Sequence, residues 1–288
     1  MKKKIAVIGT GLMGSRVAVR LVENNFNVSV YNRTAEKAKA LESSGILVYE
    51  DVASAVKENE IMIIFLSDYR AINNVLFSDV SVSFREKTVV QMSTISPDEN
   101  LALKKEIEKQ GGAFVEAPVL GGITQAQNGE LVVMAGASEI QFEELKELFS
   151  VIGNNVKLIG PAGSASALKL SFNQLIATLN TAFCMSLAYV QDKGIDTGVF
   201  MDILRNSALY APAFDKKLDN FINRSYDKTN FSLRLLLKDV NLAIDEFEKS
   251  RVDCLTLKGV KFILERGMHF ELGEKDYSSL FEIIYPKK

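Results

Sequence analysis

Lys169 and Asn173 form the pair of residues in this sequence that is best suited to proton transfer. Lys169 stands at the start of a mostly apolar run, and Asn173 follows it at the spacing of one helical turn. An ammonium group can stabilise negative charge on a carbonyl oxygen and donate a proton to it, and partial burial would lower its pKa toward neutrality. The pair therefore predicts acid–base chemistry on a carbonyl group. A solvated lysine on an exposed helix is the alternative.

The segment around this pair contains two kinds of residue when it is drawn as a helix. The polar or small residues on one stripe are Lys169, Asn173, Ala177 and Asn180, and the large apolar residues on other sides are Leu168, Phe172, Leu175 and Leu179. A charge on so apolar a helix needs a wet or liganded cavity. The run from Leu168 to Tyr189 could cross a bilayer by length, but its polar residues favour a buried helix of a soluble protein.

A glycine-rich turn near the N-terminus predicts a site for the phosphates of a dinucleotide. The motif follows an apolar run over 5–8 and opens a helical pattern over 15–23, which is the strand–turn–helix setting that GxGxxG requires. Its members are Gly9, Thr10, Gly11, Leu12, Met13 and Gly14. The glycines allow the tight turn, the approach of the pyrophosphate and close packing of helix on strand, and the free amides of the helix then face the phosphates. A turn without a ligand is the alternative.

The end of the second predicted strand favours NADP(H) over NAD(H). An NAD-preferring site places a carboxylate there, about 20 residues after the glycines, against the ribose hydroxyls. This chain has Asn32, Arg33 and Thr34 instead. Arg33 can pair with a 2′-phosphate and Thr34 can donate to it. NADP(H) is therefore the expected cofactor and NAD(H) the alternative.

Apolar runs alternate with helical patterns over the first 160 residues, and only helical patterns follow. The predicted strands cover 5–8, 28–31, 61–66, 89–92, 114–116 and 131–134, and the later helices cover 164–193, 196–206, 231–249 and 255–266. Apolar strands separated by helices are typical of a parallel sheet covered on both faces. The sequence predicts an α/β Rossmann-type dinucleotide-binding domain over 1–162. An all-α domain over 163–288 follows, and it includes a long helix that joins the two domains.

Local signals predict where several elements begin and end. A capping box over 96–99 starts a helix, with a proline at the first helical position. Thr34 is placed to cap a helix over 35–44, which Gly45 ends. The dipeptide at 128–129, Asn-Gly, predicts a tight turn before the strand at 131.

Composition argues against several classes of protein. A net charge of −2 provides no positive field for nucleic acid or an anionic membrane. Two distant cysteines and a single histidine argue against a disulfide framework and against a metal site. The basic N-terminus leads through an apolar run into glycines, and this run is too short for the signal peptide that such a start resembles. We therefore expect a cytoplasmic protein that binds no nucleic acid, membrane or metal.

With these residues the chain resembles the β-hydroxyacid dehydrogenase family, which includes 3-hydroxyisobutyrate dehydrogenase and the glyoxylate and succinic semialdehyde reductases. The resemblance covers nearly the whole chain and rests on several ordered motifs beyond the cofactor block. These motifs are Ser93-Thr94-Ile95-Ser96-Pro97, Glu116-Ala117-Pro118-Val119-Leu120-Gly121-Gly122, Gly163 with Lys169 and Asn173, Lys238-Asp239 with Leu242-Ala243, and Gly273 with Asp276.

The resemblance assigns further residues to the site. The implied cofactor contacts are Leu66, Thr94 and Lys238, and the implied carboxylate-binding amides belong to Leu120, Gly121 and Gly122. For the three cofactor contacts, a core, strand-end or solvent-facing role is the alternative. The family usually has Asp and Ser where this chain has Glu116 and Leu120, so a hydroxyl contact to the substrate carboxylate is lost.

Together these features predict an NADP(H)-dependent oxidoreductase that interconverts a small aldehyde or keto acid and its hydroxy acid, with Lys169 as the general acid and base. The substrate would carry a carboxylate, as succinic semialdehyde and glyoxylate do, and we expect a homodimer or homotetramer. One alternative is a non-catalytic nucleotide-binding scaffold, which the presence of Lys169 and Asn173 disfavours. Another is an imine reductase, which typically lacks the lysine.

Overall fold

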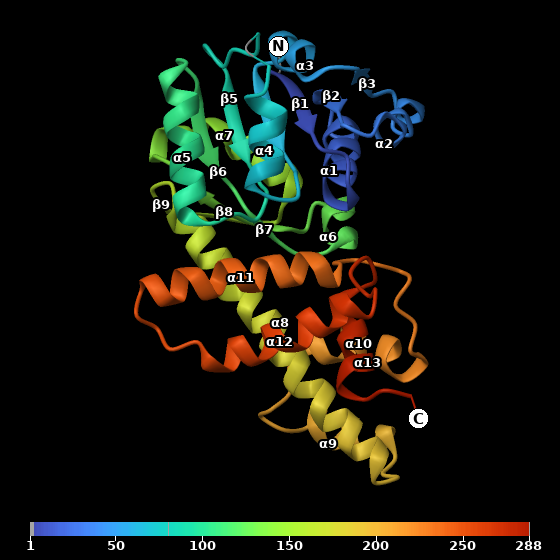
Figure 1. Cartoon of the computed structure of the whole chain (residues 1–288). Coiled ribbons are helices and arrows are strands. Elements are labelled where there is room, and N and C mark those ends of the chain that lie inside the picture. Colours follow the sequence, from blue (N-terminus) through green and yellow to red (C-terminus); the bar gives the residue numbers. More distant parts are fainter. Residues whose placement is uncertain (1–2, 80, 288) are drawn as a thin grey trace. The chain divides into compact units, whose positions relative to one another are not determined.

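The computed structural model describes residues 3–79 and 81–287. The chain divides into two compact units, residues 1–169 and 170–288, and the long helix α8 (Ser164–Asp192) runs from the first into the second. The first unit is α/β and the second is helical (Figure 1), which confirms the predicted fold class. Among the helices of the described ranges, none combines the length and the apolar character that a membrane crossing needs.

Strands and helices alternate through the first unit. In chain order they are β1 (Lys4–Ile8), α1 (Leu12–Glu23), β2 (Asn27–Tyr31), α2 (Ala35–Lys39), η1 (Glu42–Ser44), β3 (Leu47–Tyr49), α3 (Val52–Glu58), β4 (Ile61–Ile64), α4 (Tyr69–Leu76), β5 (Thr88–Gln91), α5 (Pro97–Lys109), β6 (Ala113–Glu116), β7 (Val119–Leu120), α6 (Ile123–Asn128), β8 (Val132–Gly136), α7 (Glu139–Ile152) and β9 (Asn155–Gly160). The predicted strands are all present, with bounds that differ by at most two residues.

One sheet forms the centre of this unit, with the strand order β3-β2-β1-β4-β5-β6-β8-β7 and with β9 beside β8. The strands from β3 to β6 are parallel, whereas β8 is antiparallel to β6 and β7. Side chains alternate between the two faces of a strand. Ile5 and Val7 of β1 therefore join the core with α1 and α7, and Ala6 and Ile8 join the core with α3, α4 and α5 (Figure 1). Burial on both faces explains the continuous apolar strands.

Parallel strands bring their carboxyl ends to one edge of the sheet, and the segments that follow β1, β2, β4 and β5 carry most of the predicted cofactor residues. The helix that follows β5 starts as predicted. The Ser96 hydroxyl accepts a hydrogen bond from the Glu99 amide, and the Glu99 carboxylate accepts one from the Ser96 amide. This reciprocal cap fixes the start of α5 next to the strand end.

Two local predictions need correction. The predicted helix over 35–44 is broken into α2 and η1, and Thr34 occupies the cap position of α2 without a side-chain hydrogen bond. Gly45 ends this segment in the left-handed region, as predicted. The turn predicted at 128–129 is present, since Gly129 adopts a left-handed conformation that ends helix α6 shortly before β8. Strands β3 and β9 were not predicted, because the residues of both are partly exposed.

The second unit is built from helices around one apolar core. After α8 come α9 (Thr197–Arg205), α10 (Pro212–Asn223), α11 (Leu233–Lys249), α12 (Leu255–His269), η2 (Tyr277–Ser279) and α13 (Leu280–Ile284). Phe183 of α8 stacks on Phe214 of α10 with ring centroids 4.6 Å apart. The helices predicted over 196–206, 231–249 and 255–266 are all present, and the last continues to His269.

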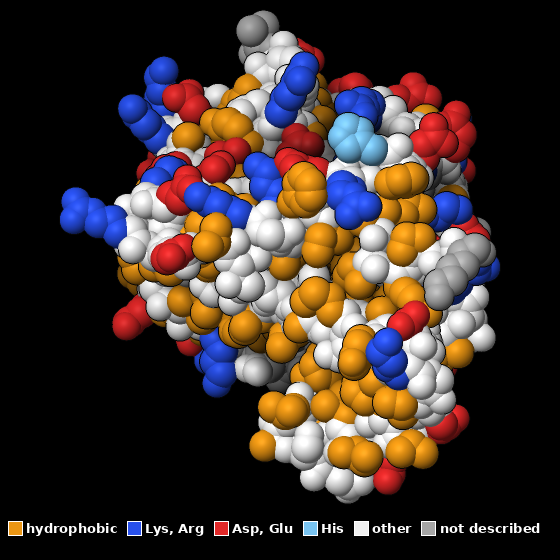
Figure 2. Space-filling view, turned by 60° about the horizontal axis from the view of Figure 1, so that its bottom comes forward, with side chains coloured by type: hydrophobic (Ala, Val, Ile, Leu, Met, Phe, Trp, Pro, Cys, Tyr) orange, Lys and Arg blue, Asp and Glu red, His pale blue; other side chains and the backbone are white. Residues whose placement is uncertain are grey.

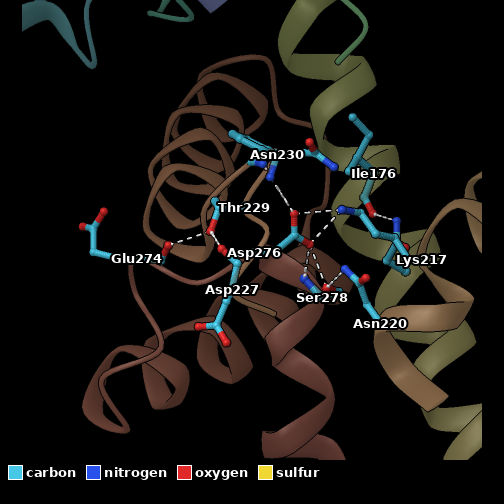
Figure 3. Close-up of polar contacts among 11 residues, drawn as sticks. Ile176, Lys217, Asn220, Asp227, Thr229, Asn230, Glu274, Asp276 and Ser278 are labelled. Atoms are coloured by element: carbon cyan, nitrogen blue, oxygen red, sulfur yellow. Dashed lines mark hydrogen bonds and ion pairs between the residues drawn. The ribbon is translucent and has the colours of Figure 1, made fainter. Parts of the chain in front are cut away.

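A buried carboxylate organises the C-terminal part of this unit (Figure 3). Asp276 is fully buried, and its two oxygens lie 2.7 and 2.8 Å from the ammonium of Lys217 on α10. The Asn230 amide and the Ser278 amide and hydroxyl also donate to Asp276. These four donor groups make five hydrogen bonds to one buried carboxylate, and they offset the cost of removing its charge from water. The network therefore ties α10 to the start of α11 and to the C-terminal segment.

Candidate active site

The glycine-rich turn has the shape of a phosphate-binding loop. Gly11 is the first residue before α1, and no side chain caps this helix end. Apart from the chain neighbours of Gly11 and the backbone of α1, no atom of residues 3–79 and 81–287 lies within 4 Å of the position that a Cβ at Gly11 would occupy, so the backbone is open on that side. The hydroxyl of Thr10 is buried and has no hydrogen-bond partner among the described residues. An anion at this helix end would meet uncapped amides and the positive end of the helix dipole, so the turn fits a pyrophosphate.

The other two glycines of the turn are required by packing. Gly9 has φ +100°, and a Cβ there would lie 2.2 Å from the carbonyl oxygen of Phe65 after β4. A Cβ at Gly14 would lie 2.0 Å from the carbonyl oxygen of Gly9 itself. Side chains at these positions would push α1 away from the sheet. The tight turn at Gly9 and the close packing at Gly14 agree with the predicted roles of these residues, and the approach of a pyrophosphate at Gly11 stays a prediction.

The end of β2 lies beside the turn. The Asn32 side chain accepts a hydrogen bond from the Thr10 amide at 3.0 Å and donates to the Thr34 carbonyl at 2.9 Å. Asn32 therefore braces the loop in addition to any contact with a ribose. Arg33 and Thr34 are exposed next to it, which leaves the guanidinium accessible to an anionic group.

Two more predicted cofactor residues lie at neighbouring strand ends. Leu66 approaches Gly9, since its Cδ2 would be 3.0 Å from a Cβ there. Its amide donates to the Ser93 hydroxyl at 2.8 Å, which links the segments after β4 and β5. Thr94, the next residue, is half-buried. Ser93, whose role the sequence reading did not recognise, therefore helps to position both neighbours.

One amide of the predicted carboxylate-binding segment, residues 120–122, is already hydrogen-bonded to the side chain of Gln125. Gly121 has φ +142°, a conformation that favours glycine. The amide of Gly122 donates to the Gln125 side-chain oxygen at 2.9 Å. A substrate carboxylate would have to take this amide over from Gln125. Leu120, at the end of β7, is half-buried.

The lysine and asparagine of α8 are both buried, with exposed fractions of 8% and 2%. Ala177 and Asn180, further along the predicted stripe, are fully buried as well. The apolar residues Leu175 and Leu179 are instead 44% and 38% exposed. The prediction of a buried helix is therefore wrong for this side, because α8 turns its polar stripe inward and part of its apolar surface outward.

A carboxylate on α11 holds the asparagine in place. The Asn173 amide nitrogen donates to Asp239 at 2.5 Å, and the Asn173 side-chain oxygen is buried without a partner among the described residues. The other oxygen of Asp239 is 2.9 Å from the ammonium of Lys238. Asp239 thus brings two predicted site residues together and orients the free Asn173 oxygen as an acceptor. The sequence reading gave Asp239 no role, since its partner is 66 residues away.

The chain matches family models over nearly all of its length. Residues 4–160 match the NAD binding domain of 6-phosphogluconate dehydrogenase, and residues 163–284 match a model described as NAD-binding of NADP-dependent 3-hydroxyisobutyrate dehydrogenase. The chain belongs to the β-hydroxyacid dehydrogenase family. Members of this family bind a nicotinamide dinucleotide, and the chain is an NAD(P)-dependent dehydrogenase or reductase that acts on CH–OH groups.

Individual relatives support this membership. The chain is 28% identical to glyoxylate/succinic semialdehyde reductase 1 of Arabidopsis thaliana over 98% of both chains. It is 30% identical to 2-hydroxy-3-oxopropionate reductase of Escherichia coli over 84% of this chain and 83% of that protein. The structure of 3-hydroxyisobutyrate dehydrogenase from Salmonella typhimurium superposes with a TM-score of 0.89 at 20% identity, covering 98% of this chain and 100% of the other. The last comparison shows the shared fold.

Proposed function

We propose that this enzyme is an NADP(H)-dependent reductase of a small aldehyde or keto acid and that Lys169 is its general acid and base. The observation that carries the proposal is the buried pair on α8, in which Asn173 follows Lys169 by one helical turn. The side-chain amide of Asn173 donates a hydrogen bond to Asp239. When bound, the nicotinamide supplies or accepts the hydride. The protein must then stabilise the oxygen that becomes negative and give it a proton.

Lys169 can do both, because its ammonium is a cation and a proton donor. Burial makes this charge more effective than it would be in water, since fewer water dipoles screen it. Asn173 offers its side-chain oxygen as an acceptor, which suits the hydroxyl that forms in the reduction or reacts in the oxidation. In oxidation, neutral Lys169 would take up the hydroxyl proton.

The preference for NADP(H) rests on the end of β2. No carboxylate stands there, and the exposed Arg33 is free to pair with a 2′-phosphate. Asn32 is committed to the loop through its two hydrogen bonds. Arg33 is therefore the residue that we expect to discriminate between the two cofactors.

The proposed substrate carries a carboxylate, which residues 120–122 would bind through backbone amides. Relatives named for glyoxylate, succinic semialdehyde and 2-hydroxy-3-oxopropionate reduction support this class. Leu120 supplies no hydroxyl, so the carboxylate contact would rely on amides and on displacement of Gln125 from Gly122. We expect glyoxylate and succinic semialdehyde to be the first substrates to test.

We also propose that the enzyme is a homodimer or homotetramer. Helix α8 carries no charged residue between Leu170 and Gln191, and Leu175, Leu179, Met185 and Tyr189 are at least 38% exposed. Figure 2 shows that hydrophobic side chains are exposed among the polar ones on the face that it draws. A surface of this kind favours association over exposure to water. Light scattering on the purified protein, and on Leu179→Asp, measures the assembly.

Replacement of the lysine tests the proposed chemistry. Lys169→Ala should lower kcat for NADPH-dependent reduction of succinic semialdehyde or glyoxylate by roughly a hundredfold or more, the range of general acid catalysis. Its Kd for NADPH should stay within about twofold of wild type. Lys193→Ala, at an exposed lysine just after α8, is the matched control and should leave kcat unchanged. A kcat for Lys169→Ala within about tenfold of wild type, or ~1.4 kcal/mol in the barrier, would remove Lys169 from this role.

A further inference from the structure

Helix α8 has no cap of its own at its N-terminus. The amides in the first turn of a helix lack partners within the helix, and a preceding Ser, Thr, Asp or Asn usually accepts from them. Here the preceding residues 160–163 are Gly-Pro-Ala-Gly, and none has a side chain that could accept a hydrogen bond. The helix that carries Lys169 therefore has to be held from elsewhere in the chain.

Glu116 supplies the missing acceptor from the end of β6. One carboxylate oxygen accepts from the amides of Gly163 at 2.8 Å, Ala165 at 2.7 Å and Ser166 at 3.3 Å. The other oxygen accepts from the Ser166 hydroxyl at 3.0 Å. The side chain is fully buried. Burial raises the pKa of Glu116 and these hydrogen bonds oppose the rise, so the donors compensate a real cost of desolvation.

The Glu116 side chain fits beside β8 because residue 136 of that strand is a glycine. A Cβ at Gly136 of β8 would lie 2.2 Å from the accepting oxygen of Glu116 and 2.5 Å from its Cγ. Gly136 pairs with Glu116 across the two strands. The carboxylate is thus fixed from the sheet side by the strand pairing and from the helix side by four donors.

We infer that Glu116 is a positioning residue of the proposed reaction, on which this inference rests. Lys169 follows Ala165 by four residues, so one helical turn separates it from the amides that Glu116 holds. Glu116 also lies four residues before Leu120, in the strand that leads to the proposed carboxylate site. Its carboxylate connects the segment that would bind the substrate to the helix that carries the proposed acid. A fixed connection at this point sets where the Lys169 ammonium stands relative to the substrate segment.

The test compares Glu116→Ala, Glu116→Gln and the control Ser138→Ala, which removes the cap of α7 in the same unit. Turnover of succinic semialdehyde is measured per NADPH-binding site, well below the Tm of each variant. Glu116→Ala should lose roughly a hundredfold in kcat, the effect of a misplacement of about 1 Å, with the Kd for NADPH within twofold of wild type. Backbone hydrogen exchange over 163–169 should accelerate. Glu116→Gln keeps one carbonyl oxygen for the three amides, so it should recover most of kcat.

Ser138→Ala should lower the Tm and leave kcat unchanged. If Glu116→Ala does not fold, Ser166→Ala removes only one donor and should show a smaller fall in kcat together with faster exchange over 163–169. The inference is overturned if kcat of the folded Glu116 variant, or of Ser166→Ala in its place, equals that of wild type while Lys169→Ala is inactive. It is also overturned if Ser138→Ala loses as much kcat as Glu116→Ala. Activity retained by Lys169→Ala would instead overturn the proposed function.

Discussion

The same substitution at two glycines of the phosphate-binding turn should have opposite consequences. Gly14→Ala places a Cβ 2.0 Å from the carbonyl oxygen of Gly9, whereas ordinary contact begins at 3.4 Å. Helix α1 and this carbonyl would have to separate by roughly 1.4 Å, the difference between the two distances. Gly11→Ala meets no atom within 4 Å, and φ at Gly11 is −72°. Alanine therefore fits at position 11 and not at position 14.

The magnitudes follow from these contacts. Overpacking of this kind costs about 1–3 kcal/mol, so Gly14→Ala should lower the Tm by several degrees at ~2–4 °C per kcal/mol. Gly11→Ala should change the Tm of the protein without cofactor by no more than about 1 °C, because exposed substitutions without new contacts change stability little. It should nevertheless weaken NADPH binding at least about tenfold, or ~1.4 kcal/mol, since the new methyl group stands where the backbone would approach the pyrophosphate.

Thermal unfolding and NADPH fluorescence titration measure the two effects separately. Both variants are measured with and without NADPH, and the rise in Tm with cofactor gives an independent estimate of binding. The reasoning is refuted if Gly11→Ala binds NADPH as wild type does, because the open side of the turn would then not be where the phosphates lie. An unchanged Tm for Gly14→Ala would refute the packing argument.

Three further predictions follow from named contacts. Arg33→Ala should weaken NADPH binding by roughly 1–3 kcal/mol and leave NADH binding unchanged; an equal loss in both titrations would show that Arg33 does not recognise the 2′-phosphate. Asp276→Ala should cost about 3–5 kcal/mol in urea unfolding because it leaves the Lys217 ammonium buried and uncompensated, and Lys217→Met in the same chain should restore part of it. Burial raises the pKa of Glu116 in the folded state, so the folded state takes up a proton at a higher pH than the unfolded state does. The free energy of unfolding of wild type should therefore rise relative to that of Glu116→Gln as the pH falls from the raised pKa to the pKa of the unfolded state. A stability difference in urea unfolding that stays flat, or shrinks, over this pH range would contradict the last prediction.

The sequence by itself determined the features that depend on neighbours along the chain. Turn chemistry identified the loop from Gly9 to Gly14, because a tight turn and a close helix each require glycine at a fixed spacing. The capping box at Ser96 was equally local, and its two hydrogen bonds are present. Apolar runs located the parallel strands because strands buried on both faces cannot alternate in polarity. The edge strand β3 was not predicted, because its residues are partly exposed.

Only the tertiary structure decided which distant side chains meet. Asn173 and Asp239 are 66 residues apart, and Glu116 and the start of α8 are 47 apart, yet each pair shares hydrogen bonds. No periodicity records such pairs, because their geometry depends on how helices and strands pack after they form. The orientation of α8 belongs to the same class. Its sequence shows a polar stripe and an apolar surface, but which of them faces inward depends on the partners that the buried Lys169 and Asn173 find in the folded chain.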